Sequence, residues 1–181
     1  RVDANQGWKT SSQALYVLRQ VEDCEIDWIE QPVVAHDIDA LAEVRAKTTI
    51  PVMVDEGIHS FKEMREVIAK KAADIINIKL MKCGGLYRGS QLVHIAEMAG
   101  MTCQVGSMVE SSIASAAGLH LATAKKSIHS HELVGPLMFS MDVSELPFMK
   151  NSVSLPDKPG LGIDIDENAL RELTVKKIEI R

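Results

Sequence analysis

Several protein classes are disfavoured by what this sequence lacks. No apolar run approaches the roughly 20 residues that cross a bilayer, and residues 1–3 do not begin a signal peptide. Acidic residues outnumber basic ones, 25 to 20, so the net charge of -5 leaves no basic surface of the kind that binds nucleic acid. We therefore expect neither a membrane protein nor a nucleic-acid-binding protein.

Cysteine is also scarce. Its three residues, Cys24, Cys83 and Cys103, are odd in number, scattered and flanked by sequence typical of a protein core. A disulfide framework needs paired cysteines and an oxidising compartment. We therefore expect reduced thiols in a cytoplasmic protein.

Short apolar segments alternate with amphipathic ones along the 181 residues. Apolar residues at helical spacing predict helices over residues 10–22, 37–47, 60–71, 88–100 and 111–125. Apolar runs predict strands at residue 2 and over residues 27–29, 51–54, 75–80, 101–105 and 130–134. Near-continuous apolar strands are usually buried on both faces, as in parallel sheets.

The predicted strand ends recur at an even pitch. They fall at Asp3, Glu30, Asp55, Lys79, Gly106 and Glu132. The separations are 27, 25, 24, 27 and 26 residues, about the length of one βα unit. Six such units build either part of a (β/α) barrel or an open doubly wound sheet, and no glycine-rich dinucleotide loop follows the first strand.

We therefore predict an α/β fold, a partial barrel. The length suits one domain, spanning residues 1–181, with 151–181 as a C-terminal extension. A barrel of eight units needs two more, and the sequence starts without Met inside a predicted strand. We expect the chain to be part of a longer polypeptide.

The carboxyl ends of barrel strands face one mouth, so Asp3, Glu30 and Asp55 are expected to converge there. Three like charges need a cation, and oxygen ligands favour Mg²⁺. Lys79, beside a metal and partly desolvated, is expected to have a lowered pKa that suits a general base. Taken singly, each residue also has an ordinary interpretation: a helix cap or loop residue for Asp3, a solvated turn residue for Glu30, and a snorkelling lysine for Lys79.

Longer motifs resemble those of the enolase superfamily, and the muconate-lactonizing subgroup fits best. They are RVDANQGW (1–8), WIEQP (28–32), VDEG (54–57), NIKLMKCGG (77–85), VGSMVES (105–111) and KPGLG (158–162). The resemblance runs in order along essentially the whole chain. It implies strands three to eight of a TIM-type barrel, with the N-terminal capping domain and the first strands absent and residues 151–181 packing on the barrel or on that capping domain.

The resemblance also implies roles. Asp3, Glu30 and Asp55 would bind Mg²⁺, with Mn²⁺ as a substitute, and the metal would stabilise the enediolate formed when a proton next to a carboxylate is removed. Asn5 and Glu56 would be neighbouring polar residues that support the magnesium ligands. Lys79 would be one of two catalytic lysines; the other belongs to a Lys-x-Lys motif upstream of Asp3, which this chain lacks, so the isolated segment should be inactive.

Within the subgroup, residues 28–40, 107–112 and 132–137 resemble racemases of N-acylated amino acids, in particular N-succinyl arginine or lysine. The main alternative is a dipeptide epimerase of the Ala-Glu type. Such enzymes carry Asp-x-Asp where residues 132–134 read Glu-Leu-Val, and a lost carboxylate weakens a site for a free ammonium group. Further alternatives are muconate cycloisomerase, o-succinylbenzoate synthase and an inactive barrel fragment. Magnesium binding would distinguish an enzyme from an inactive fragment, which need not bind the metal.

Three residues near the later strand ends have open roles. Ser107 could contact substrate, Glu110 could face the mouth or cap the following helix, and Glu132 could meet a cationic substrate group or form a structural salt bridge. The expected partners are a small carboxylate substrate and further copies of the chain in a homo-oligomer.

Overall fold

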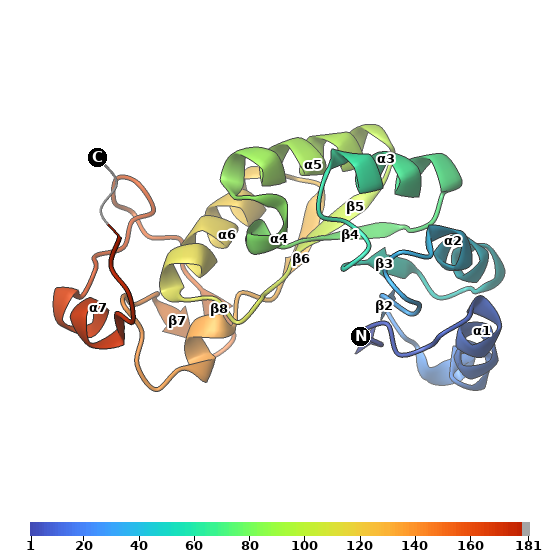
Figure 1. Cartoon of the computed structure of the whole chain (residues 1–181), viewed down its shortest axis with the longest axis horizontal. Helices are drawn as coiled ribbons and strands as arrows, with labels where there is room; N and C mark the ends of the chain where they lie inside the picture. Colours follow the sequence, from blue (N-terminus) through green and yellow to red (C-terminus); the bar gives the residue numbers. More distant parts are fainter. Residues whose placement is uncertain (179–181) are drawn as a thin grey trace.

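Parallel strands form one curved sheet in the order of the sequence. The structure, a computed structural model that describes residues 1–178, contains six such strands. They are β1 (Val2–Asp3), β2 (Ile29–Glu30), β3 (Val52–Val54), β4 (Ile75–Ile78), β5 (Thr102–Val105) and β6 (Ile128–His131). Each strand pairs with the next, and the sheet runs from β2, beside α1 (Ser11–Gln20), to β6, beside α6 (Ser112–Ala124) (Figure 1). A doubly wound sheet would reverse this order at a switch point, so the predicted partial barrel is confirmed as a curled half-barrel.

Helices follow the strands and cover one side of the sheet. The long ones are α1 (Ser11–Gln20), α2 (Ile38–Lys47), α3 (Phe61–Lys70), α5 (Leu86–Met98) and α6 (Ser112–Ala124). The short ones are η1 (Glu22–Cys24), α4 (Leu80–Cys83) and η2 (Gly135–Met138). The capping box at Ser60 and Glu63 fixes where α3 begins. None of the helices within residues 1–178 is long and apolar enough to cross a membrane.

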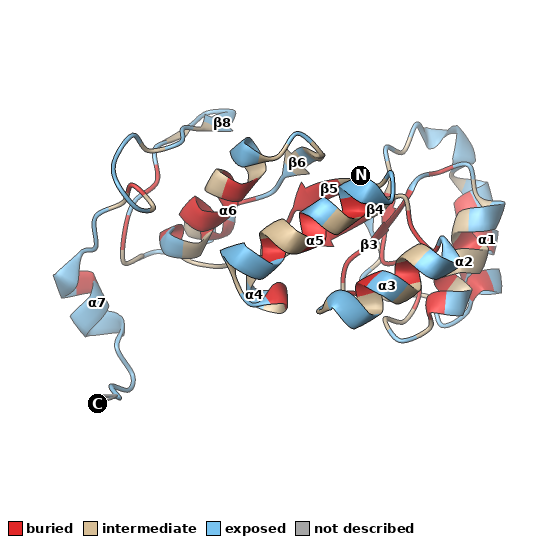
Figure 2. Cartoon of the chain, turned by 90° about the horizontal axis from the view of Figure 1, so that it is seen from above, coloured by how far each residue is buried: buried red, intermediate tan, exposed pale blue. Residues whose placement is uncertain are grey.

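The apolar core lies between the helices and the sheet. Leu41, Val52, Met64, Ile76 and Val93 are all at most 1% exposed and belong to this cluster. Figure 2 shows the buried residues along the strands and on the sheet-facing sides of the helices. Each such side chain contributes roughly 1.5–3 kcal/mol on burial, so this interface holds the strand ends in place.

The other face of the sheet is lined partly by polar side chains. Gln104 Nε2 donates a weak hydrogen bond to Sδ of the fully buried Met53 at 3.9 Å. Gln104 Oε1 accepts a hydrogen bond from Ser130 Oγ at 2.9 Å. Asn77 Nδ2 donates to Glu30 Oε1 at 2.6 Å. Alternate strand residues point to opposite faces, so these side chains share the face opposite the helices. Asn77 connects this face to Glu30, a predicted site residue at a strand end.

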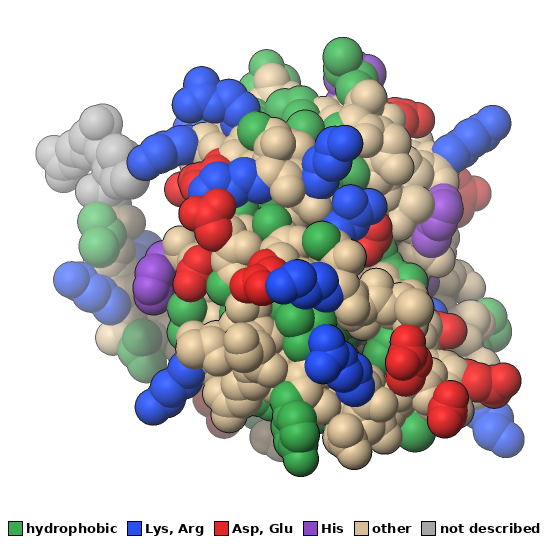
Figure 3. Space-filling view, turned by 90° about the vertical axis from the view of Figure 1, so that its right-hand side faces the viewer, with side chains coloured by type: hydrophobic (Ala, Val, Ile, Leu, Met, Phe, Trp, Pro, Cys, Tyr) green, Lys and Arg blue, Asp and Glu red, His purple; other side chains and the backbone are tan. Residues whose placement is uncertain are grey.

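The surface near α2 and α3 carries charges of both signs side by side (Figure 3). Lys47 pairs with Glu43 at 2.5 Å, and Lys70 lies 2.9 Å from both Asp39 and Glu66. Exposed pairs of this kind contribute roughly 0–1 kcal/mol each.

The C-terminal segment, defined here as residues 139–178, packs against α6. It contains the hairpin of β7 (Phe148–Met149) and β8 (Ser152–Val153), and α7 (Glu167–Leu173). Asp142 Oδ2 accepts hydrogen bonds from Ser112 N at 2.7 Å and Ser112 Oγ at 2.8 Å, and so caps the start of α6. His120 Nε2 lies 3.2 Å from the Leu161 carbonyl oxygen. Residues 179–181 of the predicted extension lie outside the described residues.

Most predicted strands differ from the observed ones by one to three residues at an end, and two of these differences concern candidate site residues. The strand expected over residues 75–80 ends at Ile78, because Lys79 is the N-cap of α4, a single helical turn. The strand expected over residues 130–134 is found at Ile128–His131, where its pairing with β5 is irregular at Cys103 and Gln104. Both corrections place an ionisable residue, Lys79 or Glu132, directly after a strand.

Candidate active site at the strand ends

The predicted acids lie at neighbouring ends of β1, β2 and β3. Asp3 and Glu30 are the last residues of their strands and are paired in register, and Asp55 directly follows Val54. Asp3 is exposed, whereas Glu30 and Asp55 are only 4% and 2% exposed. The structure therefore brings the three acids to the same end of the sheet, with two of them buried.

The environment of Glu30 shows that the carboxylates act on one another. Burial is the largest cause that raises the pKa of Glu30 to about 7. The hydrogen bond from Asn77 opposes this shift, while the negative charges of Asp3, Asp55 and Glu132 add to it. A buried acid surrounded by like charges favours protonation or a nearby cation.

Two lysines divide the carboxylate of Asp55 between them. Lys79 Nζ donates to Asp55 Oδ2 at 2.6 Å, and Lys82 Nζ donates to Asp55 Oδ1. The Lys79 and Lys82 side chains are 12% and 7% exposed. The sequence predicts Lys79 as a site residue and contains Lys82 only within the motif at residues 77–85. The one sequence signal for Lys82 is its position three residues after Lys79 in that motif.

Without a metal the pKa of Lys79 is raised, whereas the lowered pKa predicted from the sequence is for Lys79 beside a bound metal. Burial does lower the pKa of the ammonium, but the hydrogen bond and charge of Asp55 raise it. Glu30 and Glu132 add to the rise, and the net shift is upward. An adjacent carboxylate outweighs desolvation here because it stabilises the charged form directly.

Gln31 is fully buried, and the sequence analysis does not predict it as a site residue. Its side-chain oxygen accepts hydrogen bonds from Asp55 N and Gly57 N, both at 3.0 Å, and its Nε2 donates to the Val33 carbonyl at 2.9 Å. Its backbone adopts φ 34, a left-handed conformation that is unfavourable for a side chain of this size. The three hydrogen bonds offset this strain and hold the backbone of Asp55.

The two predicted supporting residues differ in what they contact. Asn5 acts through its backbone, since Asn5 N donates to Asp3 Oδ1 at 2.8 Å. Glu56 follows Asp55, and its Oε2 atom is buried without a hydrogen-bond partner among the described residues. An unpartnered buried carboxylate oxygen is costly, so this atom is a ready acceptor beside the site.

The loop after β5 is organised around Glu110. Its carboxylate accepts hydrogen bonds from Met108 N at 2.6 Å, Ser107 Oγ at 3.1 Å and Ser115 Oγ at 3.0 Å. Glu110 therefore ties the loop to the first turns of α6. Asp142, not Glu110, accepts from the backbone at the start of that helix.

Glu132 is exposed directly after β6. Ser107 N donates to Glu132 Oε2 at 3.4 Å, a long hydrogen bond. Within residues 1–178 no ion pair to Glu132 is found, so the structural salt bridge is not seen there. Its charge reaches both Glu30 and Lys79.

The donor set fits a hard divalent cation. Burial and, to a smaller extent, repulsion by neighbouring carboxylates raise the pKa of Glu30, and a cation relieves such repulsion. Among the residues that the structure describes, however, no group of three His, Cys, Asp or Glu is already arranged to hold a metal ion. Asp55 is engaged by the two lysines instead, so metal binding by Asp3, Glu30 and Asp55 stays a prediction.

Fold and site together define a (β/α)-barrel of the type that gathers acids and lysines at its strand ends. The sequence matches the family described as enolase C-terminal domain-like over residues 1–169. The chain belongs to this family within the enolase superfamily.

Relatives of known activity are racemases, epimerases and cycloisomerases. N-succinyl-L-Arg/Lys racemase of Bacillus cereus is 58% identical over 175 residues, which cover 97% of this chain and 47% of that protein. L-Ala-D/L-Glu epimerase of Clostridium acetobutylicum is 39% identical, covering 91% and 47%. Muconate cycloisomerase 1 of Rhodococcus opacus is 36% identical, covering 96% and 47%. The chain thus spans about half the length of these relatives.

Solved structures agree with these matches. The crystal structure of N-succinyl Arg/Lys racemase from Bacillus cereus superposes with a TM-score of 0.95 at 57% identity, covering 97% of this chain and 48% of that one. Dipeptide epimerase from Cytophaga hutchinsonii, complexed with Mg and the dipeptide D-Ala-L-Val, gives a TM-score of 0.90 at 31% identity, covering 96% and 48%. The predicted superfamily and subgroup are confirmed.

Proposed function

We propose that the polypeptide containing this chain is an isomerase that racemises N-succinylated arginine or lysine, within a wider class of N-acylated amino acids. The observation that carries the proposal is the 58% identity to N-succinyl-L-Arg/Lys racemase across nearly the whole chain. The acids and lysines at the strand ends supply the matching chemistry. The fold alone would not select this substrate.

Each residue has a proposed part in proton transfer next to the substrate carboxylate. Asp3, Glu30 and Asp55 would hold Mg²⁺, which supplies positive charge for the substrate carboxylate and for the charge that develops on proton loss. Lys79 would exchange the α-proton on one face of the substrate. Among the described residues Asp55 is its one acceptor, so the rest of its ammonium is available to the substrate.

Glu132 supports a substrate with a positive charge. An exposed carboxylate without an ion pair in residues 1–178 suits the side chain of arginine or lysine. The same carboxylate suits the ammonium group of a dipeptide, which makes dipeptide epimerisation the second candidate function. We also propose a cytoplasmic location, which the three free cysteines support. A homo-oligomer is a further proposal.

Proton exchange in D₂O tests the substrate. The complete polypeptide with Mg²⁺ is incubated with N-succinyl-L-arginine, N-succinyl-L-lysine, neutral N-succinyl-L-norleucine or L-Ala-L-Glu, and loss of the α-proton signal is followed by NMR. We expect fast exchange on the two cationic succinylated substrates and slower exchange on norleucine. Exchange on the dipeptide alone would make the protein an epimerase, and no exchange on any substrate would contradict the proposal.

The variant Glu132→Gln tests whether Glu132 recognises the positively charged side chain of the substrate. It should narrow the difference between N-succinyl-L-lysine and N-succinyl-L-norleucine, because it removes the charge that distinguishes them. The matched change Glu43→Gln, in an exposed pair on α2, should leave the difference as it is. An unchanged preference in Glu132→Gln would show that another group recognises the cationic side chain.

A further inference from the structure

Lys82 is a buried lysine for which the proposed chemistry has no use. It lies in the one-turn helix α4, and its side chain is 7% exposed. Burying an ammonium group is unfavourable unless its hydrogen-bonding groups are satisfied and its charge is balanced. The contacts of Lys82 show how both conditions are met.

The ammonium of Lys82 uses all three of its donors on the ends of β3 and β4. It donates to the backbone oxygen of Asp55 at 2.6 Å, to Asp55 Oδ1, and to the backbone oxygen of Asn77 at 3.4 Å. A lysine has three N–H bonds and no acceptor, so none is left for a substrate. Lys82 therefore joins the two strands, and it binds both the backbone oxygen and the side chain of Asp55.

Lys79 contacts the same carboxylate in a different way. It reaches only Asp55 Oδ2, at 2.6 Å, and has no other acceptor among the described residues. Exchanging this one hydrogen bond for another partner leaves the strand ends connected. The two lysines thus divide the carboxylate into an oxygen that is anchored, Oδ1, and an oxygen that is released when Lys79 moves, Oδ2.

The turn at Gly84 and Gly85, which follows α4, keeps Lys82 close to Asp55 at the end of β3. Gly84 adopts φ 86 and ends α4 after one turn, and both Gly84 N and Gly85 N donate to the Leu80 carbonyl. A left-handed residue at this place favours glycine. The short helix keeps Lys82 beside Asp55 instead of carrying the chain away from the site.

We propose that Lys82 is a positioning residue, which anchors Asp55 through its backbone oxygen and Oδ1 so that Oδ2 is the oxygen presented to a bound divalent cation. This inference rests on the proposed magnesium site. It differs from a simple charge balance, in which Lys82 would only neutralise nearby acids. The two roles predict opposite effects on metal affinity.

Magnesium binding to the complete polypeptide and its variants distinguishes these roles. Lys82→Met removes the donors and the charge and keeps much of the side-chain volume. If Lys82 positions Asp55, the Mg²⁺ dissociation constant measured by calorimetry should rise roughly 10–100-fold, as for other groups that orient metal ligands. Lys82→Arg, which keeps charge and donors, should recover part of the loss. Unchanged or tighter binding in a folded Lys82→Met protein would overturn the proposal.

Two control variants separate positioning from general destabilisation. Val67→Ala opens space in the core under α3, where Val67 is fully buried, and should lower the melting temperature without changing Mg²⁺ affinity. Lys47→Met removes an exposed lysine and should change neither. If Val67→Ala weakens Mg²⁺ binding as much as Lys82→Met, the effect of Lys82 is one of stability alone and the proposal fails.

Crystal structures supply a second test that does not depend on the variant folding. With Mg²⁺ bound to the unsubstituted polypeptide, Lys82 should stay on the Asp55 backbone oxygen and Oδ1 while Lys79 leaves Oδ2. A structure in which Lys82 has left Asp55 would overturn the proposal. If the unsubstituted polypeptide binds no Mg²⁺, the proposed function fails, and the metal-free structures of the unsubstituted and Lys82→Met proteins decide. An Asp55 carboxylate that keeps its orientation without Lys82 overturns the positioning role.

Discussion

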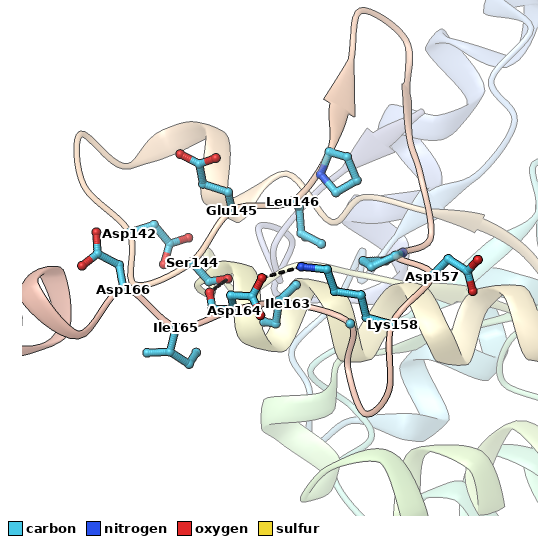
Figure 4. A pocket seen from close by; sticks show the side chains of 13 residues that line it. Asp142, Ser144, Glu145, Leu146, Asp157, Lys158, Ile163, Asp164, Ile165 and Asp166 are labelled. Carbon is cyan, nitrogen blue, oxygen red and sulfur yellow. Dashed lines mark hydrogen bonds and ion pairs between the residues drawn. The ribbon is translucent and has the colours of Figure 1, made fainter.

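The strand ends and the C-terminal segment both pair lysine with aspartate, in opposite surroundings. At the strand ends the Asp55 side chain is 3% exposed and is held by two lysines that are themselves nearly buried. In the C-terminal segment Lys158 pairs with Asp164 while the two side chains are 58% and 84% exposed (Figure 4). The same residue types form a cross-linked site in one place and a solvated surface in the other. Burial, not residue type, distinguishes the two.

The pocket drawn in Figure 4 belongs to the C-terminal segment. Asp142, Asp164 and Asp166 contribute to its lining, and none of the predicted site residues does. Asp164 and Asp166 are exposed to water, and Asp142 is half-buried where it caps α6, whereas Glu30 and Asp55 are both buried. The predicted chemistry therefore rests on the buried charges at the strand ends and not on this pocket.

The largest effect is expected when the proton-transferring lysine is removed. Lys79→Ala should lower kcat/KM for N-succinyl-L-arginine by roughly 10²–10⁴-fold, the usual contribution of a positioned acid or base. Lys158→Ala removes the exposed lysine of the C-terminal pair and should leave kcat/KM unchanged. The assay is racemisation by the complete polypeptide with Mg²⁺. Equal losses in both variants would remove the distinction between the two regions.

Breaking each ion pair at its aspartate compares the two regions by stability. In the metal-free polypeptide, Asp55→Asn leaves Lys79 and Lys82 without their balancing charge, and breaking a buried pair costs roughly 3–5 kcal/mol. Asp164→Asn should cost at most roughly 1 kcal/mol, because water replaces the partner. Urea unfolding measures both free energies. A small effect of Asp55→Asn would show that the strand-end pairs are no stronger than surface pairs.

Apolar side chains should follow the same division. Leu41 is fully buried between α2 and the sheet, so Leu41→Ala should lower the free energy of unfolding by roughly 2–5 kcal/mol. Leu170, on α7, is 41% exposed, and Leu170→Ala should change it by under about 1 kcal/mol. Urea unfolding again measures both. Similar losses at the two positions would mean that α7 is covered in the complete polypeptide.

The smallest effect is expected at the cap that joins the C-terminal segment to α6. Asp142→Ala removes the acceptor for Ser112 N and Ser112 Oγ, and loss of such a cap costs roughly 0.5–2 kcal/mol. Hydrogen exchange should rise at the start of α6 and in residues 139–178, with little change at β1–β4. The exposed control Asp157→Ala should leave exchange unaltered. Faster exchange throughout the sheet would show that the cap stabilises the whole domain.

Local patterns were enough to predict most of the fold. Helical spacing placed α2 and α3 within a residue or two of their bounds, since amphipathic helices carry their core-facing residues in the sequence itself. The strands that pair irregularly or end at a cap, β6 and β4, were displaced or too long in the prediction. Their bounds depend on neighbours that the local pattern does not contain.

By itself, the sequence determined that acids and Lys79 follow successive strands, and consecutive βα units make those strands parallel, so that every carboxyl end lies at one edge. Only the tertiary structure decided how these groups interact. Asp55 meets Lys79 and Lys82 from 24 and 27 residues away, and Gln31 bonds its backbone across a separation of 24. Such contacts set the burial, the pKa direction of Lys79 and the role of Lys82, since electrostatic effects depend on distance and solvent exclusion in the folded chain rather than on order along it.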